Sequence, residues 1–171
     1  MYKYTICFIE QGDKLLLLNR DRPPAMGLWN GVGGKLEAGE TPLAGVKREV
    51  VEETGLSLAN FRYCGIVSWE VDQEDNGGMY VFRVSVPEHI KLNTPLRIDE
   101  GVLEWKDKSW VLGKGNHGMG VIIPNYLPAV LAGEACYEHR CIIDNNQLKS
   151  YEAIPISSDV DTLHAVIQAS L

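Results

Sequence analysis

The sequence has few cysteines and no long apolar run, and both shortages exclude whole classes of protein. Its four cysteines among 171 residues stand far apart, so they form neither a zinc knuckle nor a two-residue redox motif. The apolar stretch at residues 119–133 contains two prolines and falls short of the ~20 residues that cross a bilayer. The first ten residues hold too short an apolar stretch for a signal peptide. We therefore expect reduced thiols, no membrane partner and a cytoplasmic location.

Positive charge is also scarce, because 16 lysines and arginines stand against 23 aspartates and glutamates, for a net charge of −7. Such a field repels polyanions, so we expect no nucleic acid polymer as a partner. A small anion that carries its own cation remains possible. A chain of this length is typical of one domain with a sizeable core, so we expect a single domain over residues 1–171, as a monomer or a homodimer.

Apolar periodicity and turn residues predict strands and helices without regular alternation. A helix is expected from Thr41-Pro42 to Thr54-Gly55, because threonine can cap free amides, proline suits the first helical position and glycine supplies a left-handed cap. The other expected elements are hairpins at 2–9 with 14–19, 63–71 with 79–86 and 136–143 with 147–153, a strand at 103–105, and helices at 126–132 and 159–170. This mixture favours the α+β class, an α/β/α sandwich on a mixed sheet, with residues 134–171 extending the same domain.

The first expected helix carries three glutamates on one face. The side chains of Glu49, Glu52 and Glu53 fall within an arc of about 100° and repel one another near the helix C-terminus, where the helix dipole also disfavours anions. Arg48 relieves only part of this repulsion. Clustered carboxylates are hard oxygen ligands, so this face predicts a site for Mg²⁺ or Mn²⁺. A solvated acidic face is the alternative, but the nearby Gly33-Gly34 pair lets the backbone approach a ligand closely.

These residues belong to a longer pattern. Gly34, five residues, Glu40, seven residues, Arg48-Glu49-Val50, one residue, Glu52-Glu53, one residue and Gly55-Leu56 match every fixed position of the Nudix box. The segment before it, residues 28–35, resembles the corresponding segment of MutT-type and mammalian oxidised-purine nucleoside triphosphatases. The resemblance to the Nudix family implies the Nudix fold and hydrolysis of a nucleoside diphosphate linked to another moiety. Such enzymes use a divalent cation and an attacking water.

The resemblance also implies how the metal is held. Glu49, Glu52 and Glu53 would be ligands, together with the carbonyl oxygen of Gly33, and Glu49 would also deprotonate the water. Glu100 is similar in context to a fourth carboxylate that joins this site in the family. The alternative for Glu100 is a loop acid in water.

Other matching residues would position the site or bind the substrate. Arg48 would hold the catalytic carboxylates in register through ion pairs, and Glu40 would brace the loop against the helix. Lys35 and Arg20 resemble phosphate contacts of the MutT type. Asn30 resembles an asparagine that contacts the purine, although it could also be a turn residue that bonds its own backbone.

The sequence does not decide which residues would contact the base. Mammalian members use two adjacent aspartates near the second helix, and this sequence has no such pair there. Asn125 could serve in their place. Four aromatic residues could stack on a base or belong to the core: Trp69, Tyr80, Trp105 and Trp110.

The sequence therefore predicts a Mg²⁺-dependent hydrolase that attacks nucleoside triphosphates at the β-phosphorus, giving monophosphate and pyrophosphate. Oxidised purines such as 8-oxo-dGTP are the favoured substrates. ADP-ribose, a dinucleoside polyphosphate or an ordinary dNTP remain alternatives. So does a nucleotide-sensing module without turnover, although the complete set of Arg48 and three glutamates speaks against it.

Overall fold

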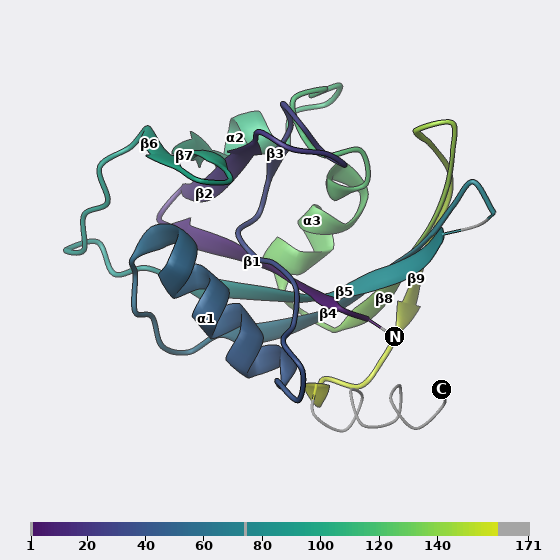
Figure 1. Cartoon of the computed structure of the whole chain (residues 1–171), viewed down its shortest axis with the longest axis horizontal. Coiled ribbons are helices and arrows are strands. Elements are labelled where there is room, and N and C mark those ends of the chain that lie inside the picture. The colour runs from purple at the N-terminus through teal and green to yellow at the C-terminus, as the bar shows by residue number, and fades with distance from the viewer. Residues whose placement is uncertain (1, 74, 161–171) are drawn as a thin grey trace.

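The computed structural model describes residues 2–73 and 75–160, and in that part of the chain nine strands form one mixed sheet (Figure 1). The strands are β1 (Tyr4–Gln11), β2 (Lys14–Arg20), β3 (Trp29–Asn30), β4 (Arg62–Val71), β5 (Asp75–Ser85), β6 (Leu96–Ile98), β7 (Gly101–Asp107), β8 (Tyr137–Asp144) and β9 (Gln147–Pro155). The described helices are α1 (Pro42–Thr54), α2 (Lys108–Val111) and α3 (Ile123–Ala132). The order across the sheet is β6-β7-β2-β1-β5-β4-β8-β9, and β3 pairs with β2.

The sheet separates two apolar cores, which confirms the expected α/β/α sandwich. Side chains of β1 alternate between them, with Cys7 and Ile9 on the side of α1 and Ile6 and Phe8 on the side of α3 (Figure 1). Two pairs of strands run parallel, β1 with β5 and β4 with β8, while the other pairs are antiparallel. The sheet is buried on both faces near its centre, so its central strands are almost wholly apolar there.

Helix α1 begins and ends where the sequence predicts. The Thr41 side chain accepts a hydrogen bond from the Ala44 amide at 3.2 Å, and Pro42 occupies the first turn. Gly55 adopts the left-handed conformation, with φ of 71°, and its amide bonds the Val51 carbonyl. Because both caps are local, the position of the helix follows from the sequence alone.

The three predicted hairpins are present, although β5 begins at Asp75 rather than at the expected residue 79, and their turns use residues suited to positive φ. Gly12 turns β1 into β2 with φ of 59°, and Asn145 and Asn146 turn β8 into β9 with φ of 50° and 57°. Two positive values in succession are typical of a tight hairpin turn that matches the twist of the strands. The hairpins thus confirm the pairing of residues 136–143 with 147–153.

Helix α3 begins at Ile123 rather than at the expected Tyr126. Pro124 lies in its first turn, where an amide would have no partner within the helix, so the proline does not delay the start. The helix predicted at 159–170 lies almost wholly outside the described residues. None of the described helices combines the length and apolar character needed to cross a membrane.

A fully buried histidine joins the last hairpin to α3. His139 on β8 stacks on Tyr151 of β9, and its Nδ1 lies 2.8 Å from the Tyr151 hydroxyl. The rings of Tyr126 on α3 and Tyr137 on β8 lie 5.6 and 5.9 Å from the imidazole. These neighbours bring no charge to offset an imidazolium, and burial lowers the pKa of His139 to about 4.

The buried imidazole predicts an acid-sensitive fold. In the unfolded chain His139 titrates near its ordinary pKa of ~6.5, so protons favour the unfolded state as the pH falls from there towards 4. As the pH falls over that range, His139 should lower the unfolding free energy of the wild type by up to about 3 kcal/mol. The His139→Gln variant should lack this part of the decrease. Urea unfolding of both proteins between pH 4 and 7 measures the difference. His89→Gln, at an exposed position, is the control, and equal slopes for wild type and His139→Gln would contradict the prediction.

Candidate active site

The site is built where the loop after β3 crosses the start of β1. The Thr5 amide donates to the Gly34 carbonyl at 2.8 Å, and the Cys7 amide donates to the Val32 carbonyl at 2.7 Å. The Leu36 amide continues this contact by donating to the Lys3 carbonyl at 2.8 Å. The loop therefore lies along β1 almost like another strand, and it carries the Gly33-Gly34 pair between β1 and α1.

Close contacts require a glycine at position 33 and leave little room for a side chain at position 34. Gly33 has φ of 150°, and a Cβ there would lie 2.3 Å from the Thr5 carbonyl oxygen. A Cβ at Gly34 would lie 2.5 Å from a carboxylate oxygen of Glu49. The small residues thus allow the acidic face of α1 to reach the loop.

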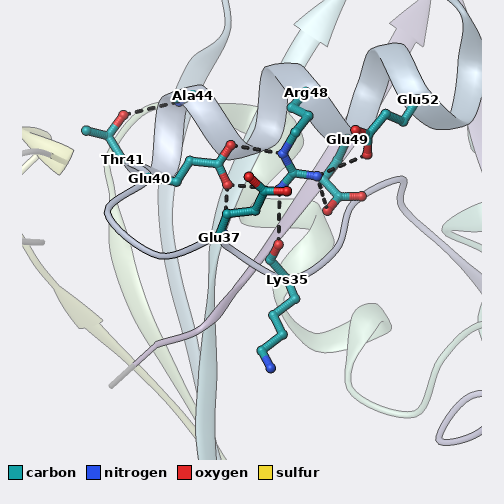
Figure 2. Close-up of polar contacts among 8 residues, drawn as sticks. All are labelled: Lys35, Glu37, Glu40, Thr41, Ala44, Arg48, Glu49 and Glu52. Carbon is teal, nitrogen blue, oxygen red and sulfur yellow. Dashed lines mark hydrogen bonds and ion pairs between the residues drawn. The ribbon is translucent and has the colours of Figure 1, made fainter.

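Arg48 lies at the centre of a network of carboxylates (Figure 2). Its Nε and one terminal nitrogen donate to both oxygens of Glu40, at 3.0 and 2.8 Å, in a bidentate pair. Its other terminal nitrogen donates to Glu49 at 2.9 Å and to Glu52 at 3.0 Å. A further bond of 3.1 Å reaches the Lys35 carbonyl, so one guanidinium joins α1 to the crossing loop.

These hydrogen bonds stabilise the charged forms of Arg48 and Glu40. Hydrogen bonding to Arg48 holds the pKa of Glu40 below its usual value, and the bond that Glu40 accepts from the Glu37 amide at 2.9 Å acts in the same direction. The carboxylates around Arg48 raise its pKa further. The bracing role that the family resemblance implies for Glu40 and Arg48 agrees with this geometry.

Glu53 is the buried member of the acidic face. Only 7% of its surface is exposed, and its carboxylate accepts a hydrogen bond from the Gly33 amide at 3.0 Å. Burial, reinforced by the charges of Glu49 and Glu100, raises the pKa of Glu53 to about 8, and burial also raises that of Glu49. Glu52 differs, since 57% of its side chain is exposed. The acidic face therefore has two carboxylates that lack sufficient compensating positive charge.

The donor set suits a hard divalent cation, although it is not gathered around one point. Among residues 2–73 and 75–160, no three acidic, histidine or cysteine side chains converge on a common metal position. Arg48 draws Glu49 and Glu52 to itself, and Gly33 holds Glu53. The buried Glu53 and the half-buried Glu49 repel each other, so a cation between them would stabilise both, and oxygen ligands are the kind that Mg²⁺ prefers. The residues present thus fit such an ion by chemistry and charge.

A cleft of about 1100 Å³ runs from these carboxylates across the sheet. Glu49, Glu53 and Glu100 line one end, and Glu100 acts electrostatically on Glu53. Arg20 and Lys35 line the same cleft, and Figure 2 draws the Lys35 side chain extending away from Arg48. The Nε atom of Arg20 is buried without a hydrogen-bond partner, so a bound anion would satisfy it.

Asn30 combines the two interpretations that the sequence left open. Its amide nitrogen donates to the Leu28 carbonyl at 3.3 Å, as a turn residue would, yet the residue lines the cleft. A Cβ at Gly120 would lie 2.7 Å from the Asn30 side-chain oxygen, so the loop before α3 closes around it. Asn125 is exposed and lies outside the cleft lining, with its side chain towards the Ile122 carbonyl at 3.5 Å.

Sequence reasoning missed most of the opposite wall of the cleft. That wall is formed by residues of β1, β4 and β5, the residue that precedes α3 and two residues of α3: Tyr4, Trp69, Met79, Ile122, Ile123 and Tyr126. Trp69 could be recognised as an aromatic residue on a strand, but strand pairing alone decides which face it takes. No local signal in the sequence identifies the others.

Comparison with known proteins agrees with this geometry. A model of the NUDIX domain matches residues 3–124. A mouse protein named oxidized purine nucleoside triphosphate hydrolase is 34% identical over 103 residues, which is 60% of this chain and 64% of the mouse protein. Haemophilus influenzae proteins named NAD-capped RNA hydrolase NudC are 41% identical over 66 residues, covering 37% of this chain and 25% of theirs. The chain thus spans less than two thirds of the length of these curated relatives.

Solved structures extend the likeness to nearly the whole chain. The MutT protein from Bacillus halodurans superposes with a TM-score of 0.76 at 30% identity, covering 92% of this chain and all of that one. The NUDIX domain of Shewanella oneidensis NrtR, solved with ADP ribose, has a TM-score of 0.54 at 17% identity over 66% of this chain and 76% of its own, and so shares the fold alone. Together with the family match over most of its length, these findings establish that the chain belongs to the Nudix family.

Proposed function

We propose that this protein is a divalent-metal-dependent hydrolase that cleaves nucleoside triphosphates to monophosphate and pyrophosphate, with oxidised purines such as 8-oxo-dGTP preferred. The observation that carries the proposal is the acidic face of α1, where Arg48 orders Glu40, Glu49 and Glu52 beside the buried Glu53 at one end of a cleft. The mouse relative that is named for oxidised purine nucleoside triphosphates supports the choice of substrate.

The residues divide the work of hydrolysis between them. Glu49, Glu52, Glu53 and the Gly33 carbonyl would hold Mg²⁺ or Mn²⁺, with Glu100 in reach of the same end of the cleft. A bound metal ion neutralises phosphate charge and lowers the pKa of a bound water. Lys35 and Arg20 would hold the phosphates in line, since phosphoryl transfer depends mainly on positioning and charge.

The displacement itself needs one base. Water attacks the β-phosphorus, its oxygen bonds there, and the bond from that phosphorus to the α–β bridging oxygen breaks. Glu49 accepts the proton of the water, and the bridging oxygen leaves with the nucleoside monophosphate. Pyrophosphate, which now contains the water oxygen, is the second product.

A second candidate substrate is a larger nucleoside diphosphate derivative such as ADP-ribose. The cleft of about 1100 Å³ is at or above the upper end of the ~300–1,000 Å³ typical of small-molecule sites, so it has room for a second sugar. A nucleotide sensor without turnover would have little use for the complete carboxylate network. A single domain over residues 1–171 and a cytoplasmic location stay predictions.

A screen that identifies the products of hydrolysis tests the proposed class of substrate. Purified protein with Mg²⁺ should hydrolyse 8-oxo-dGTP to monophosphate and pyrophosphate with a higher kcat/KM than it shows for the hydrolysis of dGTP, ADP-ribose or a dinucleoside polyphosphate. EDTA should abolish the hydrolysis. Turnover of ADP-ribose alone would replace the proposed substrate, and turnover of none of them would contradict the enzymatic function.

Replacing Glu53 with Gln should separate catalysis from folding. We expect kcat/KM to fall at least about 100-fold, the usual scale for losing a group that acts in acid–base or metal catalysis. The melting temperature in EDTA should not fall, because a neutral amide is easier to bury than a carboxylate. Glu88→Gln, at an exposed position, is the matched control. Activity of Glu53→Gln close to wild type would show the metal assignment to be wrong.

Asn30→Ala tests the contact with the base. If the side chain bonds the purine, its removal should raise KM for the preferred purine triphosphate about 5- to 10-fold, the effect of one neutral hydrogen bond, and lower kcat less. Steady-state kinetics with purine and pyrimidine triphosphates measure both constants. An unchanged ranking of the substrates would remove Asn30 from base recognition.

A further inference from the structure

Glu100 lines the cleft from a turn at the edge of the sheet. Strand β6 has three residues and pairs with β7 at that edge (Figure 1). Ile98 of β6 pairs with Gly101 of β7, so Glu100 is the second residue of the two-residue turn between them. Strand β7 is anchored along the whole length of β2, whereas among the described strands β6 pairs with β7 alone. The contacts of β6 therefore decide how the turn is held.

Charge works against the position of Glu100. Glu49 and Glu53 of α1 line the same cleft, and burial, together with the charges of Glu49 and Glu100, raises the pKa of Glu53. Glu100 is exposed, so burial of its own side chain does not keep it there. Repulsion among the carboxylates favours a turn that swings towards solvent. A restraint on the turn is therefore needed to keep Glu100 at this end of the cleft.

Backbone contacts hold one side of the turn on β2. The Asp21 amide donates to the Glu100 carbonyl at 2.9 Å, one step beyond the pairing of Arg20 with Gly101. Gly101 has φ of 153°, and a Cβ there would collide with the Asn19 carbonyl oxygen. Glycine thus lets the turn lie directly against β2. Arg20 and Glu100, which both line the cleft, are carried side by side on paired backbones.

An ion pair holds the other side of the turn. The two terminal nitrogens of Arg97 on β6 donate to the two carboxylate oxygens of Asp21, one at 3.3 Å and the other closer. This bidentate geometry fixes direction as well as distance. Because Asp21 also bonds the Glu100 carbonyl through its amide, the pair closes a ring of contacts around the turn. The Arg97 side chain is 67% exposed, so the pair adds little to overall stability and acts mainly on the turn.

We propose that Arg97 and Asp21 are positioning residues, whose ion pair holds the β6–β7 turn so that Glu100 stays beside the carboxylates of α1 and helps to bind the divalent cation. This inference rests on the metal site of the proposed function. Neither Arg97 nor Asp21 lines the cleft, so both act through the turn rather than through contact with the cation or the substrate.

Binding of Mn²⁺ to the whole chain tests this role without substrate, through the electron paramagnetic resonance signal of the free ion. Arg97→Ala and Asp21→Asn should each raise the Kd for Mn²⁺ about 2- to 5-fold, the scale of one exposed ion pair. Charge alone predicts a different result, because removing the positive Arg97 would tighten the binding of a cation. The sign of the change in Arg97→Ala therefore separates positioning from a direct effect of charge.

A double-mutant cycle shows whether the effect passes through Glu100. Glu100→Gln should raise the Kd at least as much as Arg97→Ala, and Arg97→Ala should add nothing in the Glu100→Gln background. Arg97→Lys keeps the charge but not the fork, so it should recover only part of the loss. Lys14→Ala is the matched control, because it removes one positive charge and an exposed ion pair with Asp107 at the opposite end of the β2–β7 pairing. It should not raise the Kd.

Thermal melts show whether each variant folds. Unchanged or tighter binding of Mn²⁺ by folded Arg97→Ala would overturn the proposal, as would a full effect in the Glu100→Gln background or a wild type that binds no Mn²⁺. If the wild type hydrolyses nucleotides while the ion pair has no effect on Mn²⁺, the positioning role fails and the proposed function stands. If Arg97→Ala weakens Mn²⁺ binding through Glu100 but the wild type hydrolyses none of the nucleotides, the positioning role stands and the hydrolase proposal fails.

Discussion

The structure depends on one arrangement of charge, in which a single guanidinium holds together carboxylates that would otherwise repel one another. Arg48 bonds Glu40, Glu49, Glu52 and the Lys35 carbonyl, and its planar fork satisfies several acceptors at once. Without it, Glu40, Glu49 and Glu52 would repel one another where α1 meets the crossing loop. A lysine has no such fork and could not make the same set of bonds.

That arrangement has a consequence for Glu53, which is bound to the loop and not to Arg48. Among the described residues, the Gly33 amide and, at longer range, Arg20 are what favours its charged form, and burial outweighs them, so its pKa is raised to about 8. The protein thus holds one carboxyl group in a buried position where its ionisation is costly, and such a perturbed group is typical of functional sites. The carboxylates bonded to Arg48 fix the geometry of the site. Glu53, which Arg48 does not bond, is the group that a bound cation would stabilise most.

Local features could be predicted from the sequence, and contacts between distant segments could not. The bounds of α1 follow from Thr41, Pro42 and Gly55, and its acidic face follows from helical geometry. The family pattern adds the roles of Glu40 and Arg48. The wall of the cleft that faces the carboxylates could not be predicted, because it depends on strand register, which places Trp69 against Gly77, and on the early start of α3. Pairings of that kind depend on tertiary contacts that no short stretch of sequence encodes.

The last hairpin lies beyond the family match but belongs to the same sheet. The family match ends at residue 124, yet most of α3 and all of β8 and β9 lie beyond it. Strand β8 adds to the sheet in parallel beside β4, and His139 and Cys141 belong to the core beneath α3. A chain trimmed to the family match would therefore expose an edge of β4 and remove the support for one side of the cleft. The shared family pattern thus ends before the last two strands that the sheet contains.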